Sequence, residues 1–223
     1  FAPAGLALGC LCTLAAWLAL TILSTATGAS HAMGTAWPAA ALAAWLWLAL
    51  ELWSTRGLHW DGLADLGDAC GSGASGARFR EILRDSRLGA FGALSLLLIF
   101  SGQWLALAWH LAAGQWLMPV LAPAWGRACA VWLAASAPPH NPDSLGGLAC
   151  AGAGPTVRRV YRLGALLLVC LLAALGLSLW QGLVLIVAQY CLTRRLAAQA
   201  RSHGGLSGDF LGAAIELGQL WFL

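Results

Sequence analysis

Residues 57–92 read GLHWDGLADLGDACGSGASGARFREILRDSRLGAFG, and this stretch holds much of the charge of an otherwise apolar chain. Five of the nine acidic residues lie in it, and five of the twelve basic residues lie in it or at its edge. Long hydrophobic segments precede and follow it. Because a chain that avoids charge elsewhere gathers it here beside glycines, we interpret the stretch as a functional site on a hydrophobic scaffold.

The composition identifies the class of protein. The 223 residues are 60% hydrophobic and 9% charged, with a mean hydropathy of +0.76. Soluble domains carry about 25% charged residues, so the chain is expected to be an all-α, polytopic integral membrane protein. Its length favours one domain over residues 1–223. The net charge of +3 is too small to indicate nucleic-acid binding.

Apolar runs predict the membrane-spanning helices. A bilayer-spanning helix needs roughly 17–25 apolar residues. Such runs predict about six to seven transmembrane helices, at residues 3–26, 36–53, 90–110, 116–136, 164–180, 182–199 and 209–223. The last run is short, and the 164–199 stretch is open to another division. We expect residues 137–155 to form a flexible segment rich in proline and glycine.

The arginines alternate between the connecting segments. Segments 54–89, 137–163 and 193–208 hold five, three and three of the twelve, whereas segments 27–35, 111–115 and 180–182 hold none. Basic residues next to helix ends stay in the cytoplasm, so the three basic segments are predicted to share the cytoplasmic face. This alternation supports two helices within 164–199, since a single helix would place 193–208 outside.

Asp61, Asp65 and Asp68 are spaced four and three residues apart. On a helix this spacing places three carboxylates on one face, where they repel one another unless a cation lies among them. Oxygen ligands without histidine or cysteine favour Mg²⁺, with Mn²⁺ as the alternative. A solvated acidic face is the other explanation, and the scarcity of charge in this chain argues against it.

Arg80, Arg84 and Arg87 repeat the same spacing on a second predicted helix. Guanidinium groups opposite carboxylates commonly clamp phosphoryl groups, although the two rows would alternatively pair as salt bridges. Asp85 and Ser86 lie within the row, and Asp85 is a candidate to complete the metal site or orient a hydroxyl nucleophile.

The segment HGGLSGD (203–209) is a third candidate element. Gly204 and Gly205 are expected to expose backbone N–H groups just before a helix that begins after Asp209. A glycine-rich turn at a helix N-terminus can hold phosphate. Its predicted position on the same membrane face as residues 57–92 strengthens this interpretation.

Some ionisable residues fall inside or near the predicted spans, where charge is costly and usually functional. Arg127 either reaches the substrate or pairs with Glu216 for structure, and Glu51 has the same alternatives. His59 either assists proton transfer or makes a structural hydrogen bond. The remaining histidines have no evident partners and are assigned to the membrane interface: His31, His110 and His140. The residues alone therefore predict a metal-dependent membrane enzyme that acts on phosphate or pyrophosphate.

Three motifs carry a family resemblance: GLHWDGLAD (57–65) with Asp68, REILRDSRLGAFG (80–92) and RSHGGLSGDFLGAAIE (201–216). In this order, and over nearly the whole chain, they resemble the cobalamin synthase family of adenosylcobinamide-GDP ribazoletransferases. The chain departs from the family pattern at PPHNPDSLGG (138–147), which lacks an arginine. It departs again at Leu206, where a polar residue is common, and at Phe210, where threonine is common.

The resemblance implies Mg²⁺-dependent transfer of the adenosylcobinamide-phosphate moiety to a ribose hydroxyl of α-ribazole or its phosphate, with release of GMP. It also implies a bacterial inner-membrane protein with its active site facing the cytoplasm. The expected partners are these substrates, the lipid bilayer, a second copy of the chain and other late cobalamin-pathway enzymes. Family members usually carry a further N-terminal segment, so this chain is expected to lack one.

The expected site residues fall into three groups. Catalytic roles are expected for Asp61, Asp65, Asp85 and His59, metal ligation for Asp61, Asp65, Asp68 and Asp85, and substrate binding for Arg80, Arg84, Ser86, Arg87, Arg127, Gly204, Gly205 and Asp209. Two other functions are weighed. A CDP-alcohol phosphotransferase also uses a D-G-x-x-A motif, but has arginine where this chain has Asp65. A transporter would carry charge along a path through the membrane, whereas here most charge lies in one set of loops.

Overall fold

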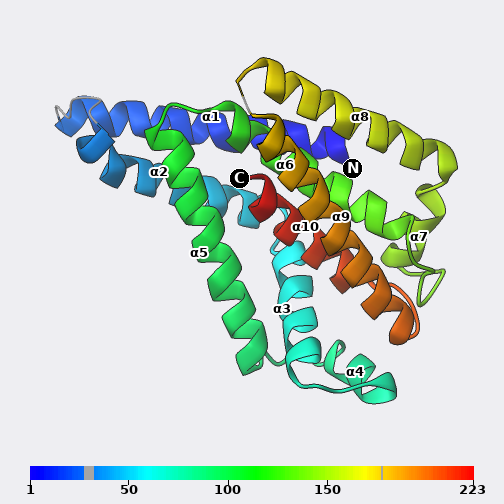
Figure 1. Cartoon of the computed structure of the whole chain (residues 1–223). Coiled ribbons are helices and arrows are strands. Elements are labelled where there is room, and N and C mark those ends of the chain that lie inside the picture. Colours follow the sequence, from blue (N-terminus) through cyan, green and yellow to red (C-terminus); the bar gives the residue numbers. More distant parts are fainter. Residues whose placement is uncertain (28–32, 177) are drawn as a thin grey trace.

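The computed structural model describes residues 1–27, 33–176 and 178–223, and within these residues the regular elements are ten α-helices (Figure 1). The predicted all-α class is confirmed. The helices are α1 (Ala2–Thr27), α2 (Met33–Ser54), α3 (Leu58–Gly71), α4 (Gly76–Ile82), α5 (Ala90–Ala112), α6 (Leu117–Ala134), α7 (Leu145–Gly152), α8 (Pro155–Ala174), α9 (Leu179–Ser202) and α10 (Gly208–Phe222).

The predicted division of 164–199 into two helices is confirmed, but its place is wrong. Residues 180–182 were expected to be the connection and instead lie within α9. The reason is a capping box at Ser178, whose hydroxyl accepts a hydrogen bond from the Gln181 N–H while the Gln181 side chain accepts one from the Ser178 N–H. This reciprocal pairing satisfies two otherwise unpaired donors and starts α9 early.

Residues 137–155 are not the irregular segment that was expected, because α7 occupies much of them. Ser144 caps this helix: its hydroxyl accepts a hydrogen bond from the Gly147 N–H at 3.1 Å. Before α7, a short parallel bridge pairs Pro139 with Leu206 in the α9–α10 connection. The segment therefore ties the start of α10 to the rest of the chain.

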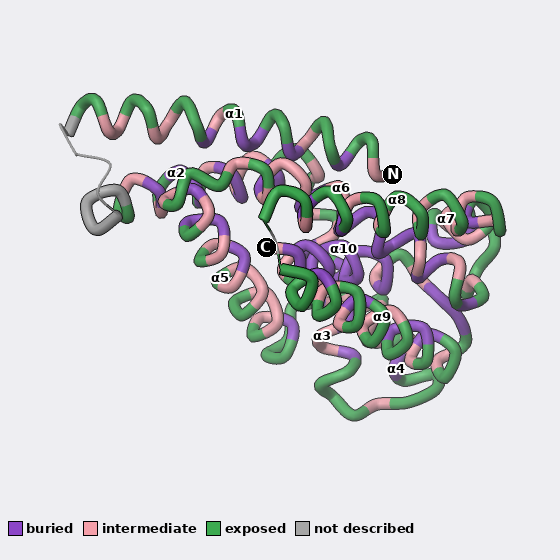
Figure 2. Tube along the Cα trace, turned by 45° about the horizontal axis from the view of Figure 1, so that its top comes forward, coloured by how far each residue is buried: buried purple, intermediate pink, exposed green. Residues whose placement is uncertain are grey.

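The outer helix faces are apolar, as expected for a membrane protein. Among the described residues, α1, α5 and α6 are long and apolar enough to cross a membrane. The outer faces of α1, α5 and α8 are largely exposed, and large side chains such as Trp17, Leu97 and Leu167 lie on them (Figure 2). In a bilayer such side chains contact lipid. The number of spans, six to seven, stays a prediction.

The short helix α10 lies at the centre of the fold, where it contacts α3, α5, α6 and α9 (Figure 1). Its close approach to α3 depends on two glycines. A Cβ on Gly62 would lie 2.7 Å from the Asp209 Cα, and a Cβ on Gly212 would lie 2.9 Å from the His59 carbonyl oxygen. The glycines thus bring the backbone of α3 directly against the backbone of α10.

A buried polar network joins α2, α5, α6 and α10. The Gln219 side chain donates to Glu51 at 2.8 Å and to Gln103 at 3.1 Å, and Gln103 donates to the Glu216 carboxylate at 3.1 Å. Arg127 lies 3.8 Å from Glu51 and donates to a backbone carbonyl of its own helix at 3.0 Å. The ion pair that the structure forms is therefore with Glu51, not with Glu216, and Arg127 lies in the core.

Candidate functional site

Asp61 and Asp65 lie on α3, at the edge of α3 that meets α10. Asp61 is exposed and Asp65 is half-buried, and Gly62 between them contacts the backbone of Asp209. Burial and the neighbouring carboxylates, first Asp61 and then Asp209, together raise the pKa of Asp65 to about 7. Two motifs far apart in sequence therefore meet here and place several negative charges close together.

These carboxylates have no ion-pair partner. Within the described residues the ion pairs are His59–Glu216, Arg78–Glu81, Asp85–Arg87 and Arg127–Glu51. The alternative in which the acidic row and the arginine row neutralise each other as salt bridges is therefore not what this structure forms.

Asp68 is placed differently from the other two aspartates of α3. One of its carboxylate oxygens accepts a hydrogen bond from the Gly89 N–H at 2.7 Å, and the other accepts one from the Gly92 N–H at 2.8 Å. These donors are the free N–H groups at the N-terminus of α5, where a negative charge is favourable. Asp68 thus anchors α5, and its expected role as a metal ligand stays a prediction.

The prediction of three arginines along one helix is wrong. α4 ends at Ile82, so it carries Arg80, whereas Arg84 and Arg87 lie in the connection to α5. Arg87 pairs with Asp85 at 2.7 Å, and its hydrogen bonds lower the pKa of Asp85 to about 2. Ser86, between them, is exposed. Asp85 and Arg87 therefore pair with each other, and their expected roles in metal and substrate binding stay predictions.

A small cavity of about 60 Å³ lies between α4, the α9–α10 turn and the start of α10. Its polar lining residues are Arg80, Arg84, His140, His203, Ser207 and Asp209. Cavities that enclose whole ligands measure about 300–1,000 Å³, so this one fits a single small group. Guanidinium and imidazole donors around such a space are suited to a phosphoryl group.

The α9–α10 turn shapes this cavity through its glycines. Gly204 and Gly205 have positive φ angles of 87° and 117°, and a Cβ on Gly205 would lie 2.6 Å from the His140 backbone nitrogen. Their N–H groups donate to the carbonyls of Arg201 and Ala200, so the expectation that they are free donors is wrong. α10 begins at Gly208, which places Asp209 in its first turn instead of before it. The Ser207 hydroxyl donates to Asp209 at 2.9 Å.

Two histidines of this site were missed in the sequence. His203 stacks on Phe79 of α4 with ring centroids 3.7 Å apart, and Arg80 donates to the His203 carbonyl at 3.2 Å. The ring of His140 hydrogen-bonds the Gly204 carbonyl at 3.0 Å. The expectation that His140 has no partner is therefore wrong, and its place at the membrane interface stays a prediction. The signal for His203 was present, since it stands inside the third motif.

Other histidines have partners as well. His59 is largely buried, with Nδ1 3.6 Å from a Glu216 carboxylate oxygen, and burial lowers its pKa to about 4. His110 lies between the Gln115 side chain and the Leu223 carbonyl, each at 2.7 Å, so it too has partners. His31 lies outside the described residues.

The carboxylates of this site fit a divalent cation that is shared with a substrate phosphate. Among the residues that the structure describes, no three His, Cys, Asp or Glu side chains are close enough to hold an ion by themselves. Mg²⁺ usually keeps several waters and binds through one or two carboxylates together with substrate phosphates. Asp61 and Asp65, which have no ion-pair partner and have hard oxygen ligands, fit a site of that kind.

Comparison with known proteins identifies the family. The family described as cobalamin-5-phosphate synthase matches residues 1–223. A protein of Nitratidesulfovibrio vulgaris (strain DP4) named adenosylcobinamide-GDP ribazoletransferase is 40% identical over 198 residues, which cover 89% of this chain and 79% of the relative. A protein of the same name from Vibrio cholerae (strain O395) is 34% identical over 224 residues, covering 97% and 77%.

No solved structure matches the chain. The resemblance seen in the three motifs is confirmed by a family match over the full length. The chain belongs to the cobalamin-5-phosphate synthase family and is a membrane transferase of cobalamin biosynthesis.

Proposed function

We propose that the protein transfers the adenosylcobinamide-phosphate moiety of adenosylcobinamide-GDP to a ribose hydroxyl of α-ribazole or its phosphate. The hydroxyl oxygen forms a bond to the phosphorus that carries the cobinamide, the bond from that phosphorus to GMP breaks, and GMP leaves with the negative charge. The names of the relatives support this reaction. The observation that carries it is the meeting of unpaired carboxylates with an arginine-lined cavity at Asp209.

We propose that Asp61 and Asp65 hold Mg²⁺ together with the pyrophosphate of the substrate. A bound Mg²⁺ would neutralise phosphate charge and polarise the phosphoryl oxygens. Arg80 and Arg84 line the adjacent cavity and would stabilise charge on the departing GMP. Asp209 lines this cavity, and its backbone lies against Gly62, between Asp61 and Asp65. Its carboxylate accepts a hydrogen bond from Ser207, and together the two side chains would orient the substrate.

The proton of the attacking hydroxyl needs an acceptor. Asp85 is engaged by Arg87, and its pKa of about 2 makes it a weak base. His59 is uncharged at neutral pH, and its ring lies near the Glu216 carboxylate, which would stabilise the ring after it accepts a proton. We therefore propose His59 in preference to Asp85 as the acceptor, because its pKa of about 4 lies above that of Asp85 and the Glu216 carboxylate would stabilise its protonated ring. We also propose that the active site lies on the cytoplasmic face of the inner membrane.

Release of GMP tests the proposal. Purified full-length protein with adenosylcobinamide-GDP, α-ribazole phosphate and Mg²⁺ should release GMP, and EDTA should stop the release. Asp61→Asn and Asp65→Asn should each lower the rate at least about 100-fold, as for loss of a main electrostatic contact. Glu81→Gln is the matched control, because this exposed carboxylate pairs with Arg78 and with no other cation among the described residues. Wild-type rates in both aspartate variants would refute the metal site.

A further inference from the structure

A second, larger cavity lies away from the carboxylates, between α6, α8 and α9. Its volume is about 530 Å³, within the range of cavities that hold a whole small molecule. Neither the three motifs nor the proposed transfer reaction uses it.

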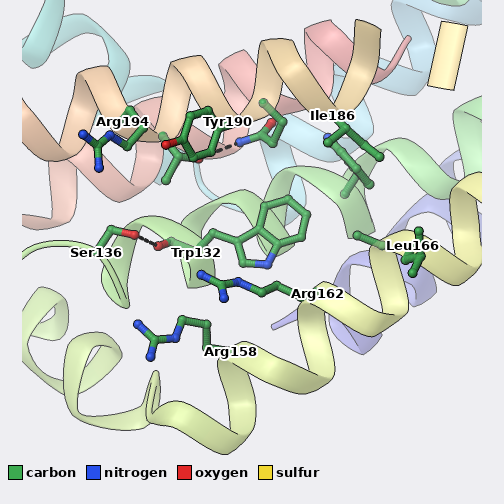
Figure 3. Close-up of a pocket in the computed structure, with 12 residues that line it drawn as sticks. Trp132, Ser136, Arg158, Arg162, Leu166, Ile186, Tyr190 and Arg194 are labelled. Atoms are coloured by element: carbon green, nitrogen blue, oxygen red, sulfur yellow. Dashed lines mark hydrogen bonds between the residues drawn. The ribbon is translucent and has the colours of Figure 1, made fainter. Parts of the chain in front are cut away.

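One end of this cavity is strongly basic. Arg158 and Arg162 project from α8 toward α6, and Arg194 lies on α9 across the cavity, with its guanidinium 6.0 Å from the centre of the Tyr190 ring (Figure 3). Among the described residues, no carboxylate lies within 4.0 Å of any of these three guanidinium groups. The ion pairs of the structure involve other side chains. Three unneutralised cations facing one space are suited to an anion, and arginine suits phosphate in particular.

The wall next to the arginines carries unpaired donors. The indole N–H groups of Trp132 and Trp125 are buried and make no hydrogen bond to the protein. Both tryptophans line the cavity, and Trp132 lies beside Arg162 in Figure 3. A buried donor without a partner costs free energy, so a ligand with acceptor oxygens at this depth would be favoured.

The opposite end of the cavity is apolar and open. Leu166 and Ile186 line it, yet they are 53% and 40% exposed. The neighbouring leucines of α8, Leu163 and Leu167, are also exposed. In a membrane protein these side chains contact lipid, so the apolar end of the cavity is continuous with the bilayer. A ligand that fits both ends carries a phosphate, ester oxygens and a hydrocarbon tail.

We propose that this cavity binds an anionic glycerophospholipid, with its phosphate on Arg158, Arg162 and Arg194 and its acyl chains along Leu166 and Ile186. Basic pockets between membrane helices bind anionic lipid headgroups by this charge complementarity. The site is separate from the proposed transfer chemistry and stands or falls independently of it. An alternative source of the same chemistry is a soluble phosphate compound.

The helices provide matched control arginines. Arg159 and Arg195 are exposed, follow Arg158 and Arg194 directly in the sequence, and do not line the cavity. The double variant R158Q/R194Q and its control R159Q/R195Q therefore remove the same charge from the same helices. Full-length protein in detergent is mixed with phosphatidylglycerol or phosphatidylcholine, and retained lipid is counted by native mass spectrometry. Thermal unfolding followed by tryptophan fluorescence verifies that each variant folds.

The wild-type protein and R159Q/R195Q should retain phosphatidylglycerol in preference to phosphatidylcholine. At about 1 kcal/mol per arginine, R158Q/R194Q should bind phosphatidylglycerol roughly 30-fold more weakly. Ile186→Trp, which fills the apolar end and keeps every charge, should also reduce retention and carries the test if the arginine variant fails to fold.

Three results would overturn the proposal. The first is equal retention of the two lipids, and the second is an equal loss in the two double variants. The third is thermal stabilisation by millimolar inorganic phosphate with none by phosphatidylglycerol, which would assign the cavity to a soluble phosphate compound.

Discussion

Asp65 and Asp68 stand one helical turn apart on α3, yet their amide variants should change stability in opposite directions. Asp65 has a pKa of about 7 against its ordinary value of 3.8, a difference that corresponds to about 4 kcal/mol at 1.36 kcal/mol per pH unit. Solvent screening of this partly exposed side chain reduces the figure to about 1–2 kcal/mol. Asp65→Asn should therefore stabilise the metal-free protein by that amount at pH 8.

The pH dependence follows from the direction of the shift. A raised pKa in the folded state means that ionised Asp65 opposes folding. That penalty is complete above pH 7, where the folded form is ionised, and is absent below pH 3.8, where both forms are protonated. The stabilisation by Asp65→Asn should therefore shrink steadily as the pH falls from 7 toward 4.

Asp68→Asn should destabilise the protein instead. Its carboxylate accepts hydrogen bonds from two N–H groups of α5, and an amide turns an N–H group toward one of them. Loss of a charge-assisted hydrogen bond costs about 1.5–3 kcal/mol. For a chain of this length, each kcal/mol shifts Tm by about 2–4 °C.

Tryptophan fluorescence of the detergent-solubilised protein measures both shifts, since the chain has 13 tryptophans. Glu81→Gln is the control and should lower Tm by at most about 2–4 °C, because exposed ion pairs contribute about 0–1 kcal/mol. Mg²⁺ at 100 times its Kd should add about 2.7 kcal/mol to the wild-type stability and much less to that of Asp65→Asn. A fall in Tm for both aspartate variants, at pH 8 without metal, would refute the reasoning about Asp65.

Three further substitutions separate the roles of other residues. Arg80→Lys should lower kcat/KM for GMP release about 100-fold, because an ammonium group cannot reproduce the planar fork of the guanidinium group. Arg78→Lys is the control: this residue is on the same helix but outside the cavity, so kcat/KM should change by less than about twofold. Gly205→Ala should reduce both activity and Tm, since the added Cβ would lie 2.6 Å from a backbone nitrogen and φ is 117°; an unchanged Tm would show that the turn tolerates a side chain. Arg127→Met should lower the free energy of unfolding by about 3–5 kcal/mol, because it leaves Glu51 buried without its ion-pair partner. Thermal unfolding will show this loss as a lowered Tm, and size-exclusion chromatography will show it as aggregation.

The sequence was sufficient for the scaffold, because hydrophobic runs and the placement of arginines are local signals. The positions of α1, α2, α5 and α6 follow from run length alone. The position of the short α4 does not follow from the length of an apolar run. Asp68 fixes the start of α5 at Gly89, and the chain between α4 and Gly89 must turn to reach it. A long-range hydrogen bond of this kind leaves no pattern in the sequence. The helical spacing of the arginines therefore predicted a helix that continues past Ile82, where α4 ends.

The site was predictable in its members more than in their partners. The three motifs were expected to share a membrane face, and the contact between Gly62 and Asp209 brings the first and third together. The sequence could not reveal that Arg87 would choose Asp85, two residues away, over the aspartates of α3. It also could not reveal the contact of His140 with the glycine turn, because the bridge of Pro139 with Leu206 joins segments more than sixty residues apart.

The central place of α10 constrains how the protein is made. This helix leaves the ribosome after all the other described helices, yet it supplies Glu216 and Gln219 to the buried network and Asp209 to the site. Until it arrives, Glu51 and Gln103 lack the side-chain partners that α10 gives them in the finished fold, and Glu51 has only its ion pair with Arg127 of α6 among the described residues. The contacts among α1, α2, α5 and α6 do not involve α10, so they can form before it arrives, and the insertion of this one short helix then closes the core and completes the site.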